Sequence, residues 1–98
     1  MELVWQIHAW EDYMYWVKND REMMRSVHIL VTDCQRRPFI GYGAPIPLKG
    51  IYTGYWSRKI RNEHRLIYTV KDQRLHILQC RYVQLSGEAA TSSRGFLT

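Results

Sequence analysis

The sequence predicts an α+β fold with an N-terminal strand and two helices packed on a twisted antiparallel sheet. Three observations lead to this prediction. Apolar residues recur at helical spacing through the first 35 residues. Residues 38–54 then hold all three prolines and four of the six glycines. After this loop come three runs in which apolar and polar residues alternate, as they do in strands.

The N-terminal elements follow from residue spacing. Residues 2–7 alternate at Leu3 and Trp5 and predict a short first strand that joins the sheet. A helix is expected from about Ala9 to Val17, because its large apolar residues fall at i, i+3, i+4 and i+7. These residues, which we expect to face the core, are Trp10, Tyr13, Met14 and Val17.

A second helix is expected to begin at a cap formed by Asn19 or Asp20 and to end before Pro38. Glu22 lies in its first turn, where the helix dipole favours an acidic residue. Its core-facing residues are predicted to be Met23, Val27, Leu30, Val31 and Cys34. The segment that follows, residues 38–54, is predicted to be a long loop, and a loop of this length in a small domain is usually functional or disordered. The rigid Pro45-Ile46-Pro47 triplet favours an ordered loop.

The strands are expected at residues 55–61, 65–70 and 74–82, with a hairpin turn at 71–73. Ninety-eight residues make one domain, which we place at residues 1–83. Residues 84–98 are small and polar, and we expect them to form a flexible tail.

Charge is segregated along the chain. Residues 1–35 carry three basic and six acidic residues, a net charge of −3. Residues 36–81 carry ten basic and two acidic residues, a net charge of +8. This distribution predicts a cationic surface for an anionic partner, of which nucleic acid is the commonest, while a solvated basic face is the plainer alternative.

Other classes of protein are disfavoured. Cys34 and Cys80 have neither the spacing of a metal site nor the number of a disulfide framework, so we expect reduced core thiols, no metal and a cytoplasmic location. The N-terminus has no basic segment followed by an apolar run, so we expect no signal peptide. No stretch reaches the ~18 consecutive apolar residues of a membrane span.

Basic residues interleaved with Tyr and Trp are typical of surfaces that bind single-stranded RNA, since cations contact phosphates and rings stack on bases. Cleavage of RNA by its 2′-hydroxyl also needs a base, an acid and cations that stabilise charge on phosphorus. Candidate acids and bases in the basic half are Glu63, His64 and His76, although a turn glutamate and a half-buried histidine are the plainer interpretation of the first two. His8 and His28 are expected to be structural. The predicted RNA-binding residues are Lys49, Arg58, Lys59, Arg61, Arg65 and Arg81.

Three segments resemble the Txe/YoeB family of toxins, within the RelE-like superfamily. GYGAPIPLK at residues 41–49 is similar to the family's G-x-G-x-P-E-P-L-K. GYWSRKIRNEHRLIY at residues 54–68 is similar to G-x-W-S-R-R-I-x-x-E-H-R-L-V-Y. CRY at residues 80–82 resembles the start of C-R-Y-H-Y, and the similarity runs without gaps from Met1 to Tyr82.

The resemblance implies a RelE-like fold and a toxin of a type II toxin–antitoxin system. Such toxins are metal-independent endoribonucleases, or mRNA interferases, which inhibit translation by cutting mRNA in the ribosomal A site through a 2′,3′-cyclic phosphate. It also implies a cognate antitoxin, a possible homodimer and no cofactor. Lys49 and Arg65 match positions that contact phosphate and stabilise charge, and Glu63 and His64 match the motif beside the arginine. Lys59 stands where the family has an arginine, so the position keeps its positive charge but loses the two parallel hydrogen bonds of a guanidinium.

Two departures concern the chemistry itself. The family's general base is the Glu of P-E-P-L-K, which is Ile46 in this sequence, and its general acid is the His of C-R-Y-H-Y, which is Val83. The Tyr that follows this His, which stacks on the substrate, is Gln84. Impaired cleavage is therefore expected, with Glu63, His64 or a ribosomal group as substitutes. The alternatives are a degenerate protein that binds ribosome, RNA or antitoxin without cutting, and a plain RNA-binding module.

Overall fold

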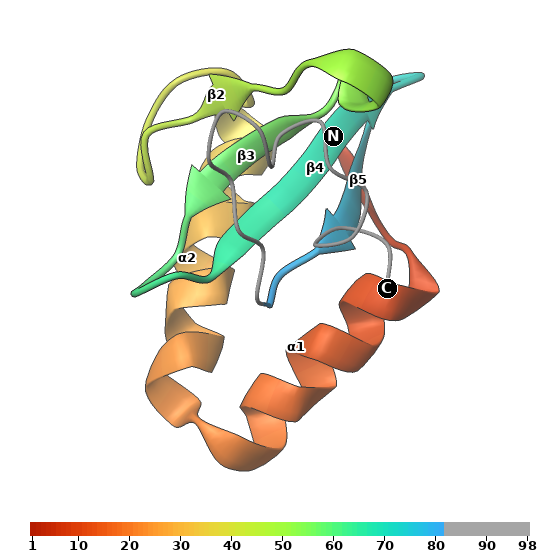
Figure 1. The fold of residues 1–98 in the computed structure, drawn as a ribbon. Coiled ribbons are helices and arrows are strands. Elements are labelled where there is room, and N and C mark those ends of the chain that lie inside the picture. Colours follow the sequence, from red (N-terminus) through yellow and green to blue (C-terminus); the bar gives the residue numbers. More distant parts are fainter. Residues whose placement is uncertain (82–98) are drawn as a thin grey trace.

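Two helices lie on one face of a five-stranded sheet (Figure 1). The structure is a computed structural model, and it describes residues 1–81. The strand order is β1-β5-β4-β3-β2, with β1 parallel to β5 and every other pair antiparallel. The elements are β1 (Glu2–Trp5), α1 (Ile7–Asn19), α2 (Arg21–Arg36), β2 (Ile46–Pro47), the 3-10 helix η1 (Gly50–Tyr52), β3 (Trp56–Lys59), β4 (Arg65–Lys71) and β5 (Arg74–Gln79).

The predicted α+β class, both helices and all four predicted strands are confirmed. β1, β3 and β5 are shorter than expected, whereas β4 extends one residue further, to Lys71. β2 and η1 lie inside the segment predicted as a loop. The two residues of β2 were not predicted because they pair only with β3, a partner that their own sequence does not reveal. The predicted tail at residues 84–98 lies outside the described residues, as does the end of the strand predicted at 74–82. No helix within residues 1–81 is long and apolar enough to cross a lipid bilayer.

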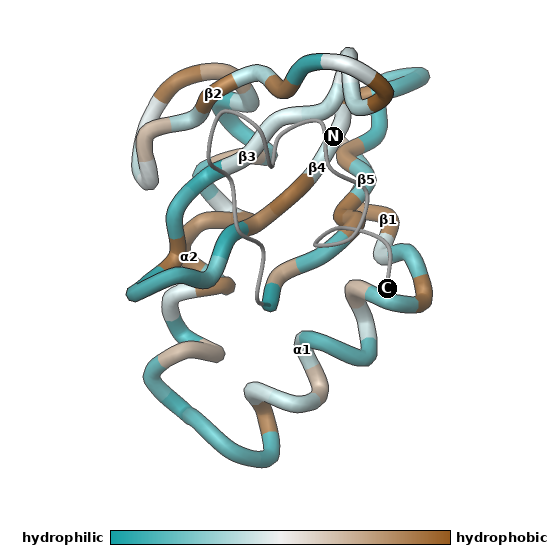
Figure 2. Tube along the Cα trace, in the orientation of Figure 1, coloured by the Kyte–Doolittle hydropathy of each residue, from teal (hydrophilic) through white to brown (hydrophobic). Residues whose placement is uncertain are grey.

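The main core lies between the helices and the sheet. All five residues predicted for the buried face of α2 are buried, and the Asp20 carboxylate caps this helix by accepting a hydrogen bond from the Met23 amide at 3.1 Å. Leu66, Tyr68 and Ile77 face these residues from the sheet. Figure 2 shows the corresponding hydrophobic colour along the central strand β4. Cys34 and Cys80 are both free and buried, so the prediction of reduced core thiols is confirmed.

The predicted buried face of α1 is wrong in part, since only Tyr13 and Met14 are half-buried and Tyr13 packs against the core. Trp10 and Val17 are exposed, and the buried residues of α1 are Ala9, Asp12 and Trp16. Hydrogen bonds explain why this other face of α1 is buried. The Asp12 carboxylate accepts a hydrogen bond from the Cys80 amide at 3.0 Å, and the Trp16 indole donates one to the Cys80 carbonyl at 2.9 Å. Both groups satisfy the backbone at the end of β5, so this face of α1 turns inward although it contains a carboxylate.

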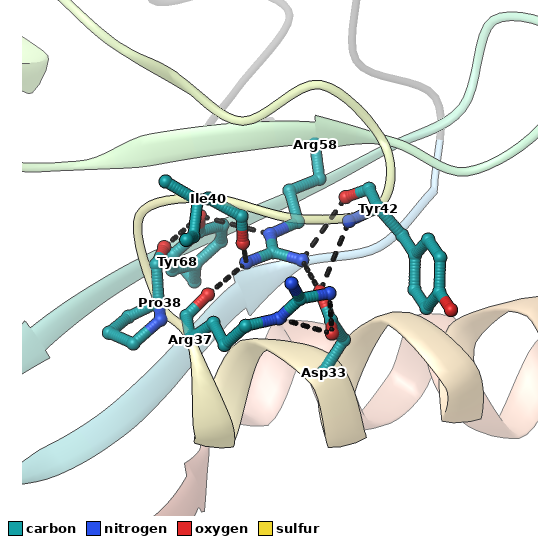
Figure 3. Close-up of polar contacts among 7 residues, drawn as sticks. All are labelled: Asp33, Arg37, Pro38, Ile40, Tyr42, Arg58 and Tyr68. Carbon is teal, nitrogen blue, oxygen red and sulfur yellow. Dashed lines mark hydrogen bonds and ion pairs between the residues drawn. The ribbon is translucent and has the colours of Figure 1, made fainter.

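A buried ion pair joins α2 to the sheet. The Arg58 side chain on β3 is 0% exposed, and its guanidinium donates to the Asp33 carboxylate of α2 at 2.7 Å (Figure 3). Burial alone would raise the pKa of Asp33, but hydrogen bonds from Arg58 and Arg37 outweigh it and lower the pKa to about 2. Both partners of the pair are therefore charged at neutral pH.

The same guanidinium organises the segment that follows α2. It also donates to the carbonyl oxygens of Arg37, Ile40 and Tyr42, as Figure 3 shows. The Tyr68 hydroxyl lies beside it and donates to the Pro38 carbonyl at 2.6 Å. Arg58 and Tyr68 thus fix the loop at residues 37–42 through hydrogen bonds to its backbone carbonyls. The prediction of an ordered loop is confirmed for this part.

Two glycines make this close approach possible. Gly41 and Gly43 have φ angles of 116° and 81°, which side chains rarely adopt. A Cβ at Gly41 would lie 2.2 Å from the Asp33 carboxylate, and one at Gly43 would lie 2.7 Å from the Lys59 carbonyl. Gly43 also accepts a hydrogen bond from the Lys59 amide at 2.7 Å, which ties the loop to β3.

Arg58 was predicted to bind RNA, and the structure corrects this prediction. All of its described hydrogen bonds are to groups inside the protein, and a fully buried guanidinium cannot reach a phosphate. Alternation along β3 accounts for the difference, since Arg58 points to the helix side while Ser57 and Lys59 point to the other face.

We expect Arg58→Ala to lower the free energy of unfolding by about 3–5 kcal/mol, because it leaves the Asp33 carboxylate buried and unpaired. Urea denaturation measures the change. Arg61→Ala is the matched control, because Arg61 pairs with Glu22 in an exposed ion pair and such pairs contribute at most about 1 kcal/mol. Equal losses from the two substitutions would contradict a structural role of the buried pair.

The acid side of the stability profile should depend on Asp33. Its folded-state pKa of about 2 lies below its ordinary value of 3.8, so the folded protein favours the ionised carboxylate. Its stabilisation is therefore present above the ordinary pKa and is lost as pH falls through about 4 towards 2. We expect the stability difference between the wild type and Asp33→Asn to shrink over this range. The exposed Glu22→Gln serves as control, and a difference independent of pH would refute the assignment.

Candidate functional site

The sheet has a second face, opposite the helices, which we call the outer face and define by Ile46, Ser57, Lys59, Arg65 and Thr69. Side chains alternate along strands, and the neighbouring Leu66 belongs to the helix-side core. The register places Ile46 beside Ser57, and Lys59 beside Arg65. Residues from three strands thus meet on one face of the sheet, where Ser57 is completely buried.

Lys59 and Arg65 form a pair of cations at one end of β3 and β4. They are direct cross-strand partners in an antiparallel ladder. Like charges in this position destabilise a sheet by roughly 0.2–1 kcal/mol. Burial lowers the pKa of Arg65, but a guanidinium still keeps its charge at neutral pH. A phosphate placed between the two side chains would remove the repulsion, which makes this pair a candidate anion site.

Ser57 connects the cation pair to residue 46. The Arg65 guanidinium donates a hydrogen bond to the Ser57 hydroxyl at 3.2 Å, and Ile46 lies opposite Ser57 in the β2–β3 ladder. Ile46 is 44% exposed. An apolar side chain therefore lies in solvent at the position where the family pattern has a carboxylate. Ser57 itself was not predicted as a site residue, although alternation in WSRK places it on the same face as Lys59.

The segment after β2 crosses the outer face. Leu48 and Tyr52 are buried and pack on Ile67 of β4, in a cluster that Tyr55 and Leu78 extend. Lys49, which lies between Leu48 and η1, is exposed. The structure thus places the predicted phosphate ligand Lys49 on an ordered segment that is anchored to the same face as Arg65.

Of the acid–base candidates, His64 and His76 lie apart from this group. Glu63 is exposed in the turn between β3 and β4. The His64 ring packs edge-on against Trp16 of α1, with 4.7 Å between ring centroids, so it lies on the helix side. Burial, and then the charge of Arg81, lowers the pKa of His64, which favours the neutral ring. His76 is on the outer face but lies opposite Thr69, several residues along the strands from Arg65.

Two further predicted RNA ligands are engaged elsewhere. Arg61 forms an exposed ion pair with Glu22 of α2 at 3.1 Å. The Arg81 guanidinium stacks on the Tyr15 ring of α1, 3.5 Å from its centroid. The outer-face site is therefore smaller than the predicted set of cations.

Val83 and Gln84 lie outside the described residues. Within residues 1–81, no three His, Cys, Asp or Glu side chains gather as a metal site would require.

Comparison with known proteins identifies the family of the chain. A family described as the YoeB-like toxin of bacterial type II toxin-antitoxin systems matches residues 5–83. The chain belongs to this family. It is 45% identical to Toxin YoeB of Escherichia coli K12 over 82 residues, which cover 84% of this chain and 98% of that protein. It is 46% identical to Toxin RelK of Mycobacterium tuberculosis over 74 residues, which cover 76% and 87% of the two chains.

Solved structures of the YoeB family share the fold. A YoeB/ParE toxin from Agrobacterium tumefaciens superposes with a TM-score of 0.81 at 46% identity, covering 83% of this chain and 96% of that one. The toxin in a heterotetrameric YoeB-YefM complex from Staphylococcus aureus superposes with a TM-score of 0.78 at 38% identity, covering 84% and 95%. The predicted family and RelE-like fold are thereby confirmed.

Relieving the repulsion between Lys59 and Arg65 should stabilise the free protein. We expect Lys59→Gln to raise the free energy of unfolding by up to about 1 kcal/mol at low salt. The gain should shrink towards 1 M salt, where the screening length falls to about 3 Å. Urea denaturation of Lys59→Gln beside Lys18→Gln, an exposed lysine on α1, measures the effect. A loss of stability in Lys59→Gln alone would show that the cations do not repel each other.

Proposed function

We propose that this YoeB-family toxin binds mRNA in the ribosomal A site through the outer face and cuts it slowly. The observation that carries the proposal is the Lys59–Arg65 cation pair, which is joined through Ser57 to the exposed Ile46. The cations on this face are suited to stabilise charge on a phosphate, while Ile46, at the position proposed for the base, cannot accept a proton. A cytoplasmic location follows from action on ribosomes.

The reaction proposed is transesterification within the RNA. The 2′-oxygen loses its proton and bonds to the adjacent phosphorus, while the bond from phosphorus to the 5′-oxygen breaks and that oxygen gains a proton. The products are a 2′,3′-cyclic phosphate and a 5′-hydroxyl. Negative charge builds on the phosphoryl oxygens, and Arg65, Lys59 and Lys49 are the cations suited to stabilise it.

The proton transfers are the weak part of this site. A carboxylate at position 46 would lie beside Ser57, and hence near the Arg65 guanidinium that would keep it ionised. Ile46 offers neither charge nor proton acceptor. General acid–base groups contribute typically about 10²–10⁴-fold each, and the effects of residues that act together are less than additive. A severe deficit therefore remains unless a ribosomal group or Glu63 substitutes.

A second candidate function is binding without cleavage. It is favoured by the same exposed Ile46, because the cations that would bind RNA remain while the base position is apolar. In this case the chain occupies the ribosome or sequesters an antitoxin. A partner antitoxin and a homodimer are both consistent with relatives, since solved Staphylococcus aureus structures are described as a YoeB-YefM complex and a YoeB dimer.

Restoring the two reactive groups should restore cleavage. We expect Ile46→Glu combined with Val83→His to raise the single-turnover rate on ribosomes programmed with a defined A-site codon by at least about 10²-fold. Primer extension on the mRNA measures the rate and the position of the cut. Arg65→Ala in the reverted protein should lower the rate again, because the charge on phosphorus loses its stabiliser.

The unmodified protein decides between the two candidate functions. A slow cut at a discrete A-site position supports the impaired ribonuclease, whereas ribosome binding with no cut supports binding alone. If the reverted protein binds ribosomes but cuts no faster than the original, the outer face is not the reaction site and the proposed mechanism is overturned.

A further inference from the structure

A depression lies at the other end of the outer face, away from the cation pair. Its volume is about 280 Å³, close to the lower limit of ligand sites. Residues from β4, β5 and the segments after β1 and η1 form its walls: Gln6, Tyr55, Thr69, Lys71, His76 and Leu78. η1 and the β4–β5 hairpin that border it lie together in Figure 1, and the Thr69 hydroxyl ties them by donating to the Gly54 carbonyl at 2.7 Å.

This depression is separate from the cation pair. Between Arg65 and Thr69 on β4 lies Ile67, which is completely buried under Leu48 and Tyr52. Four residues of strand place Arg65 and Thr69 about 13 Å apart along β4. The covered Ile67 thus divides the outer face into two sites that one extended ligand could occupy together.

The lining suits a nucleotide. Tyr55 and Leu78 supply an aromatic ring and an aliphatic wall, and both are half-buried against the Ile67 cluster. Thr69 and His76 are cross-strand partners. His76 offers its ring nitrogens, and the Thr69 hydroxyl, which donates to Gly54, can still accept a hydrogen bond. A ring beside polar groups is the combination that holds an unstacked base, whereas an acidic peptide would need only the positive charge.

Lys71 supplies a cation for the phosphate. Its cross-strand partner Arg74 is already paired with Glu2 at 2.6 Å. Within the described residues, Lys71 itself forms no ion pair and is exposed at the rim of the depression. Its charge is therefore available to a ligand.

We propose that this depression binds a second nucleotide of the same RNA strand, with its base against Tyr55 and its phosphate at Lys71. The inference rests on the proposed binding of RNA at the outer face. It adds a subsite about 13–20 Å from the cation pair, measured along β4, where bases flanking the cut are selected.

The test measures binding of a fluorescent 2′-O-methyl RNA decanucleotide, which cannot be cut, as a function of salt. Each phosphate contact on a single strand contributes about 0.7 to the slope of log affinity against log salt. We expect Lys71→Ala and Arg65→Ala each to lower the slope by about 0.7, and the double variant by about 1.4. Lys18→Ala, on α1, should leave the slope unchanged.

A second variant tests the base contact. Tyr55→Leu keeps an apolar side chain but removes the ring, and we expect it to weaken RNA binding about fivefold or more. The same variant should not alter binding of an oligoglutamate of equal charge, which has no base to stack. Circular dichroism confirms that each variant remains folded.

The outcomes separate the subsite from the proposed function. If the wild type binds RNA and Arg65→Ala weakens it, while Lys71→Ala and Tyr55→Leu behave like Lys18→Ala, the subsite is overturned and the proposed function stands. If the wild type binds no RNA, both fail. If Tyr55→Leu weakens RNA and oligoglutamate equally, the depression is not a nucleotide site.

Discussion

The buried ion pair between Asp33 and Arg58 is the interaction on which the rest of the structure depends. Two charges taken out of water are stabilising only when their remaining hydrogen-bonding capacity is satisfied. Here the capacity of Arg58 is met by three loop carbonyls and the Tyr68 hydroxyl, while Asp33 also binds Arg37 and the Tyr42 amide. The pair thereby fixes the end of α2, the loop that follows it and β3 in one arrangement.

This scaffold carries the candidate site directly. Adjacent residues of β3 serve opposite purposes, since Arg58 points inward to hold the loop while Ser57 and Lys59 point outward beside Arg65. The loop held by Arg58 leads into β2, so the same pair that stabilises the fold also sets where Ile46 lies against Ser57. Position 46 is thus placed by backbone contacts, and these contacts do not depend on its side chain.

In the proposed site, the binding groups and the position of the base come from different elements of the fold. The cations come from the ladder between β3 and β4, which the core holds in register. The position proposed for the base lies on the two-residue edge strand β2, where Ile46 is exposed. Under the proposed function, isoleucine in place of a carboxylate removes the proton acceptor, and this exposed edge position accommodates either side chain. Conversely, the fold alone gives no indication of whether the protein cuts RNA.

The fold class, the helices, the four longer strands and the buried face of α2 could be predicted from the amino-acid sequence, because these features depend on local periodicity and on the Gly and Pro residues that end elements. The sequence motifs also determined the family. Only the tertiary structure decided that Arg58 is a buried scaffold residue, that α1 buries Asp12, and that His64 and Arg81 pack against α1. The physical reason is that a charged side chain is buried or exposed according to partners from distant segments, and residue type and spacing do not specify those partners.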